Sequence, residues 1–132
     1  MTTRVALRAI NAQLQATADQ LDAGAGDGAS IEIRSGTKPA AVGDAATGTL
    51  LATLQLTKPC GTVSGGVLTL TTAFDAVVVA AGGATWARWL DADGAVLMDT
   101  DVSVAGGTGE VQLSTLSLTV GMSLPVVSAT LS

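Results

Sequence analysis

From residue 31 onward the chain is a series of short segments rich in Thr, Val and Leu, and Gly, Pro or Asp separates one segment from the next. Segments of this kind, spaced about ten residues apart, are typical of antiparallel β-strands joined by turns. In the segment 49–57, Ala52, Leu54 and Leu56 alternate with mostly polar residues, so one face of this strand is apolar and must meet another layer. The pattern predicts strands near residues 31–35, 49–57, 67–72, 76–80, 84–91, 95–100, 110–113, 116–120 and 123–131.

This number of strands, with glycine turns and no second helix, favours an antiparallel two-sheet sandwich over a barrel. We therefore predict a mainly β fold, a β-sandwich of jelly-roll or Greek-key type that covers residues 31–132. The chain has 132 residues, which is the usual size of one domain with a substantial core.

The beginning of the chain has a different pattern, which indicates one N-terminal amphipathic helix. Leu7, Ile10, Leu14 and Leu21 fall at helical spacing, and they predict a helical arm over residues 1–23. The apolar face of this arm can pack on a sheet of the same chain or of a neighbouring protomer. Alternatively, the seven-residue spacing of three of these leucines can form an oligomeric helix bundle.

Two segments have no periodicity. Residues 24–30 are mostly glycine and alanine, and we interpret them as a glycine-rich hinge between the arm and the β domain. Residues 35–48 include Lys38 and Pro39 and form a long loop or covering arm. Loops of this length are often functional, so we expect this one to contact a neighbouring subunit, with a surface loop that has no partner as the alternative.

The charge content excludes some partners and favours others. Charged residues make up 13% of the chain, whereas soluble domains usually have about 25%. A surface with so few charges suits packing against another subunit, which predicts a homo-oligomer or a lattice component. The net charge is −5 and the six basic residues are scattered, so we expect no nucleic acid partner. The chain also lacks the run of about 20 apolar residues that crosses a membrane, and it has no signal-peptide pattern.

Four aspartates lie within residues 86–101, "WARWLDADGAVLMDTD", and suggest either a metal site or a turn. The calcium-loop template fails because Gly94 follows Asp91 too closely. An Asp-Gly pair between alternating apolar residues is instead a strong hairpin signal, and it predicts a type I′ turn at Asp93 and Gly94.

The predicted turn fixes the pairing of the two strands that flank it. It aligns Leu90 with Leu97, Trp89 with Met98, and Arg88 with Asp99. An ion pair between Arg88 and Asp99 accounts for the charges without a metal. The alternative is a metal ion bound by Asp99, Asp101 and a main-chain carbonyl group.

The same register places the two tryptophans on opposite faces of one strand. Trp89 faces the core together with Ala87, and Trp86 faces outward beside Arg88. Tryptophan and arginine are enriched at binding hot spots, so Trp86 is a candidate interface anchor. The alternative is that a loop or the N-terminal helix of the same subunit covers Trp86.

Catalytic chemistry has little support in the sequence. There is no histidine and no tyrosine, and the glycine-rich stretches do not lead into a helix as a phosphate-binding loop does. Cys60 is the one cysteine, which excludes an internal disulfide, and it is most simply a small apolar core residue. We predict a protein that is not an enzyme and that uses no cofactor and no metal.

Three stretches of the sequence resemble small β-rich virion structural proteins of tailed bacteriophages and prophages. They are "IEIRSGTKPAAVGDAATGTLLATLQL", "ATWARWLDADGAVLMDTDVS" and "VQLSTLSLTVGMSLPVVSATL". The group carries an "SGT.P" loop, a "GTLLATL" strand and an arginine-bearing strand that leads into "D..G", which correspond here to residues 35–39, 48–54 and 88–94. Two features depart from the group: Asp99-Thr100-Asp101 stands where the group tends to have Asp-Gly, and the N-terminal helix has no counterpart.

The resemblance implies a noncatalytic virion component that is assembled in the host cytoplasm. The leading expectation is a capsid decoration or cement protein, a symmetric oligomer such as a trimer that binds the major capsid protein or other virion proteins. A neck, tail or fibre-associated protein is the alternative, and a carbohydrate-binding module is a third class. The candidate interface residues are Leu7, Ile10, Leu14, Leu21, Lys38, Pro39 and Trp86.

Overall fold

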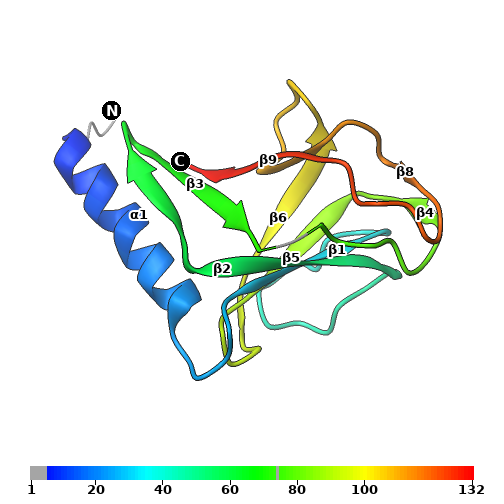
Figure 1. Cartoon of the computed structure of the whole chain (residues 1–132), viewed down its shortest axis with the longest axis horizontal. Coiled ribbons are helices and arrows are strands. Elements are labelled where there is room, and N and C mark those ends of the chain that lie inside the picture. Colours follow the sequence, from blue (N-terminus) through cyan, green and yellow to red (C-terminus); the bar gives the residue numbers. More distant parts are fainter. Residues whose placement is uncertain (1–5, 74) are drawn as a thin grey trace.

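The computed structural model describes residues 6–73 and 75–132, and it has one helix followed by short strands (Figure 1). The first five residues of the expected helical arm lie outside the described residues. In the described chain, the elements are α1 Leu7–Asp22, β1 Ser30–Arg34, β2 Leu50–Ser64, β3 Val67–Thr72, β4 Gly82–Gly83, β5 Trp86–Leu90, β6 Val96–Val104, β7 Val111–Leu113, β8 Ser117–Leu118 and β9 Val126–Leu131. The expectation of a mainly β protein with one N-terminal helix is confirmed, and most predicted strands are present with shifted ends.

The expected two-sheet sandwich is wrong, because seven of the strands close into a barrel. Their order around the barrel is β1-β2-β3-β9-β7-β6-β5, and β4 and β8 form a separate two-stranded sheet. Neighbouring barrel strands are antiparallel except β6 and β7, which are parallel. Closure pairs strands that would otherwise be sheet edges, and it thereby satisfies their backbone hydrogen-bonding groups.

The long strand β2 makes this closure possible. Its first half, Leu50 to Gln55, pairs with β1, and its second half pairs with β3. Between the two halves the register with β3 jumps from Leu56 to Gly61, so the intervening residues bulge out of the ladder. A strand that bends in this way can pair with a different strand in each of its halves. The alternation of apolar residues in the sequence does not indicate which strands these partners are.

The barrel interior holds one continuous apolar core. Inward-facing residues alternate along the strands, as Ile31 and Ile33 do on β1. Trp89 is fully buried, and its indole Nε1 donates a hydrogen bond to Thr100 Oγ1 at 2.8 Å. The expected inward face of β5, with Ala87 and Trp89, is therefore confirmed.

The helix belongs to this core. It packs against β2 and β3, and its buried residues are Leu14, Ala18 and Leu21. The expectation that the helix packs on a sheet is confirmed, and the sheet is that of its own chain. Because Leu14 and Leu21 are already buried there, they are not available as the seam of an oligomeric bundle. Within residues 6–73 and 75–132, no helix has both the length and the apolar character that a membrane crossing requires.

The segment expected to be a hinge, residues 24–30, is held against the β5–β6 turn. The Ala25 amide donates to Asp93 Oδ1 at 3.0 Å, and the Lys58 ammonium donates to the Gly24 carbonyl oxygen at 2.7 Å. A Cβ atom at Gly26 would collide with the carbonyl oxygen of Ala92. The glycine at position 26 therefore permits close packing of the backbone, beyond any flexibility that it gives.

We expect the change Leu21→Ala to lower the free energy of unfolding by about 2–5 kcal/mol, because it opens a cavity between the helix and the barrel. Leu7 lies on the same helix but is 54% exposed, so Leu7→Ala should change the free energy of unfolding by less than about 0.5 kcal/mol. Urea denaturation followed by tryptophan fluorescence measures both. Equal small effects would mean that the helix is an independent arm.

Candidate functional site

The aspartates around the β5–β6 turn bind groups of the protein itself. Asp91 Oδ1 accepts hydrogen bonds from the amides of Asp93 and Ala95, both at 2.9 Å. Asp93 binds the Ala25 amide, as described above. Asp99 binds Arg88, and Asp101 binds the Lys38 ammonium at 3.0 Å. Each of the four carboxylates therefore has a structural partner.

The predicted pairing of β5 with β6 is correct away from the turn and wrong next to it. Trp89 pairs with Met98 and Arg88 pairs with Asp99, but a bulge after Trp89 makes Leu90 pair with Val96 instead of Leu97. Positive φ angles occur only at glycines in the described chain, so the turn is not of type I′, which requires positive φ at both central residues. A hydrogen bond from the Gly94 amide to the Asp91 carbonyl oxygen instead closes a four-residue turn of residues 91–94, and Gly94, its last residue, has a φ of 84°.

The ion pair between Arg88 and Asp99 is buried, with 7% and 4% of the two side chains exposed. It is bidentate: Nε donates to Oδ1 at 2.9 Å, and Nη2 donates to Oδ2 at 3.1 Å. The hydrogen bond to Asp99 raises the pKa of Arg88 against the opposing effect of burial. A buried, doubly hydrogen-bonded pair has a defined geometry, so it fixes the alignment of β5 with β6.

Trp86 is buried within the subunit, so of the two alternatives the covering loop is correct. Its side chain is 1% exposed, and its Nε1 donates to the Ser35 carbonyl oxygen at 3.0 Å. The Arg88 guanidinium lies 5.4 Å from the centre of its ring. Two hydrogen bonds join Ser35 to Thr49, so the two ends of the loop between them are held together on this face of the barrel.

The structure does not gather the candidate interface residues into one surface. Leu14 and Leu21 lie in the core, Trp86 lies under the loop, and Ile10 and Pro39 are partly buried. Leu7 and Lys38 remain exposed, but the first is on α1 and the second is bound to Asp101 of β6. A role of these residues at an interface stays a prediction.

Cys60 lies in the core beneath the helix. Its thiol donates a weak hydrogen bond to the Ala18 carbonyl oxygen, with a sulfur-to-oxygen distance of 3.8 Å. Burial raises the pKa of the Cys60 thiol to about 12, and the nearby carboxylate of Asp22 adds to this effect. The thiol therefore stays protonated at neutral pH, which suits a core residue and not a nucleophile. Within the described residues, no three Cys, Asp or Glu side chains are arranged to hold a metal ion.

The sequence reasoning missed a group of exposed valines, which we call the valine end: Val77, Val79 and Val120. They are 56%, 64% and 66% exposed, whereas Val78 between the first two is buried. The segment 77–79 runs beside residues 121–123, because Val77 bridges Ser123 and the Gly121 amide donates to the Val78 carbonyl oxygen. The sequence predicts a strand at residues 76–80, but in the described chain these residues form only a single bridge, between Val77 and Ser123. Three valines in a row do not indicate which of them is buried, so the sequence carried no signal for the exposed pair.

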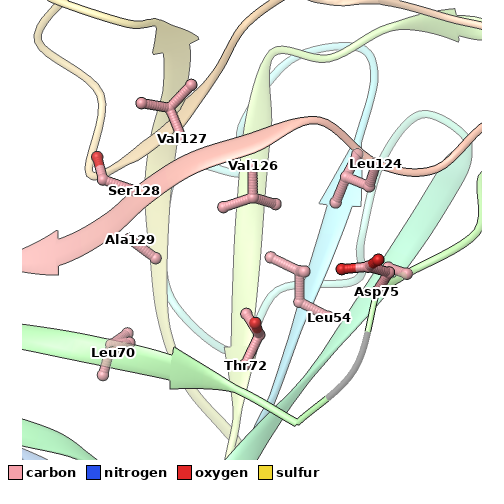
Figure 2. Close-up of a pocket in the computed structure, with 10 residues that line it drawn as sticks. Leu54, Leu70, Thr72, Asp75, Leu124, Val126, Val127, Ser128 and Ala129 are labelled. Atoms are coloured by element: carbon pink, nitrogen blue, oxygen red, sulfur yellow. The ribbon is translucent and has the colours of Figure 1, made fainter.

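A second missed feature is a cavity of about 210 Å³ between β3 and β9, which we call the seam cavity (Figure 2). Leucine, valine and alanine side chains form much of its lining, and Asp75 is its one charged lining residue. The lining residues are Leu54, Leu70, Thr72, Asp75, Ala76, Leu124, Val126, Val127, Ser128 and Ala129. Nothing in the local sequence indicated it, because it arises where two strands distant in the chain diverge.

Comparison of the chain with protein-family models, with curated proteins and with solved structures finds no match. The resemblance to phage virion proteins therefore depends on the sequence phrases alone.

Removal of one partner of the buried ion pair should be costly. We expect Asp99→Ala to lower the free energy of unfolding by about 3–5 kcal/mol, because it leaves the Arg88 guanidinium buried without its counterion. The matched change Asp101→Ala breaks the exposed pair with Lys38 and should cost less than about 1 kcal/mol. Denaturant unfolding of the two variants tests this, and equal losses would contradict the buried character of the Arg88 pair.

The protonated thiol of Cys60 predicts a pH dependence. The pKa of Cys60 is higher in the folded chain than its ordinary value of 9.0, so its contribution to stability is complete below about pH 9 and is lost as the pH rises toward about 12. The free energy of unfolding of the wild type, minus that of Cys60→Ala, should therefore be constant below about pH 9 and fall as the pH rises above it toward about 12. The subtraction cancels every contribution that the two proteins share, and a difference that does not change with pH would refute the prediction.

Proposed function

We propose that this chain is a noncatalytic structural protein of a phage virion, and specifically a capsid decoration or cement protein. The observation that carries the proposal is the valine end, an exposed apolar group on a rigid barrel that has few charges. Exposed apolar groups of this kind suit contact with another protein. The resemblance of residues 30–132 to virion proteins of tailed phages supports the same class.

The valine end is rigid enough to bind without a large ordering cost. The Val78 amide donates to the Met122 carbonyl oxygen at 2.9 Å, and the Val79 amide donates to the Leu51 carbonyl oxygen at 2.8 Å. These bonds attach the segment to its neighbour and to strand β2. A surface that is already ordered loses little conformational entropy when a partner covers it, so more of its apolar contact energy appears as affinity.

A cement protein acts through many copies. In this proposal the protein forms a symmetric oligomer, such as a trimer, and each oligomer bridges neighbouring subunits of the major capsid protein. Every bound copy stabilises the assembled state that it recognises, so modest interfaces add up to a large resistance of the shell. The net charge of −5 fits a partner other than nucleic acid.

The main alternative is a neck, tail or fibre-associated protein, for which the same valine end would contact another tail subunit. A carbohydrate-binding module is less well supported. Sugar rings stack on exposed aromatic side chains, whereas Trp86 and Trp89 are both buried and the described lining of the seam cavity has no aromatic residue.

Quantitative protein analysis of purified phage particles tests the proposal. A decoration protein should be present at a copy number comparable to that of the major capsid protein, because it covers repeated sites of the shell. A copy number that is a small fraction of the capsid protein would favour the neck or tail alternative. Absence from particles would overturn the virion assignment.

A pair of valine variants links the result to the surface. Val79→Asp should weaken association with particles at least about tenfold, because each tenfold step corresponds to about 1.4 kcal/mol and a carboxylate in an apolar contact costs more than this. Val96→Asp is the matched control, since Val96 is 36% exposed on β6 beside the β5–β6 turn and is neither part of the valine end nor a candidate interface residue. Equal loss in both variants would show that the valine end is not the contact.

A further inference from the structure

The seam cavity exists because β3 and β9 diverge. In the described chain, they pair at Leu68 with Leu131 and at Thr69 with Thr130. Further along, β9 continues with β7 as its partner, whereas β3 continues with β2. The barrel is therefore closed at one end of this seam and opens into a cavity at the other (Figure 2).

The bend before β9 helps to keep the seam open. The Val126 amide donates to the Leu124 carbonyl oxygen at 2.9 Å across Pro125, so the backbone turns sharply there. Leu124 is anchored in addition through its own amide, which donates to the Ala76 carbonyl oxygen at 2.8 Å. Because these two hydrogen bonds fix residues 124–126, the first part of β9 stays apart from β3.

The lining of the cavity combines aliphatic side chains with polar groups. Leu54, Leu124 and Val126 point into the space between the strands in Figure 2. The Asp75 carboxylate points toward the same space, and Thr72 contributes a hydroxyl group on the same side. A group that fits here needs an aliphatic body and a positively charged end.

The size of the cavity limits the occupant further. Pockets for drug-sized molecules and cofactors usually have volumes of about 300–1,000 Å³, and about 210 Å³ is below that range. A single long side chain fits such a space. The carboxylate of Asp75 is the one charged group of the lining, so it disfavours anions and favours a cation.

We propose that the seam cavity binds a lysine side chain that an extended segment of a neighbouring protein presents. The methylene groups of the lysine would pack on Leu54, Leu124 and Val126, and its ammonium group would reach Asp75. Lysine commonly buries its aliphatic stem while its charged end stays near water, which matches a cavity that has both aliphatic and polar groups in its lining. A protein of net charge −5 is also electrostatically complementary to a basic segment. The identity of the neighbour as a virion protein depends on the proposed function, whereas cation binding itself does not.

n-Butylammonium, which reproduces the lysine side chain, is the probe for a nitrogen–proton NMR titration of the whole chain. We expect saturable shifts at the amides of Leu54, Thr72, Ala76 and Leu124, and none of comparable size with butan-1-ol or butanoate. Asp75→Asn should weaken n-butylammonium binding about fivefold, the upper end for an ion pair at a partly exposed site. Asp27→Asn, which removes an exposed carboxylate elsewhere, should leave the binding unchanged.

Equal shifts with the alcohol or the carboxylate, or binding that does not respond to Asp75→Asn, would overturn the proposal. A second measurement compares the peptide acetyl-Gly-Thr-Lys-Thr-Gly-amide with the same peptide that carries norleucine in place of lysine. Binding of the lysine peptide only, at the same amides, supports a lysine in an extended chain. Binding of both or of neither contradicts it.

Particle association separates this proposal from the proposed function. If Asp75→Asn binds n-butylammonium more weakly than the wild type but decorates phage particles equally well, the neighbour does not use the cavity, and the decoration function stands. If the wild type does not associate with particles but binds n-butylammonium, the decoration function fails and the cation site stands.

Discussion

Trp86 and Trp89 lie on opposite faces of β5, and both side chains are buried. Trp89 fills the barrel interior, where Thr100 satisfies its indole nitrogen. Trp86 needs a cover on the outside of the barrel, and the loop that starts at Ser35 supplies it. Burial of a tryptophan removes about 150–250 Å² from water, so this strand is stabilised from both sides. The Arg88 guanidinium, which is paired with Asp99, lies 5.4 Å from the centre of the Trp86 ring on the same face of β5.

The sequence predicted those parts of the fold in which the interacting residues are close in the chain. The pairing of Trp89 with Met98 follows from a turn a few residues away, and the helical face of Leu14 and Leu21 follows from local spacing. Barrel closure was not predictable in this way, because it depends on pairings between strands that are distant in the chain. The strand β2 bends and pairs with both β1 and β3, and β9 pairs with both β3 and β7. The turn type was wrong because the Asp91 carboxylate, by accepting two amides, favours a turn that the Asp-Gly pair alone does not specify.

The candidate interface failed to appear as one surface for a related reason. Apolar residues at helical spacing, and a tryptophan on an outer face, are equally suited to a neighbouring subunit and to another part of the same chain. In this fold, Leu21 is buried against the barrel and Trp86 is buried under the loop. Some of the apolar residues that remain exposed, such as Val79 and Val120, belong to segments that only tertiary contacts bring together. Sequence spacing carries no information on such contacts.

The valine end and the seam cavity would contribute differently to an assembly. Apolar contact is not directional, so the valines can supply affinity but do not select one orientation of a partner. A carboxylate beside a cavity the size of one side chain is selective, because a partner without a cation in register leaves Asp75 desolvated and unpaired. A protein that must bind many equivalent sites in one orientation needs both kinds of contact. The rigid barrel holds the two surfaces in a fixed relation, so engagement of one reduces the entropy cost of engaging the other.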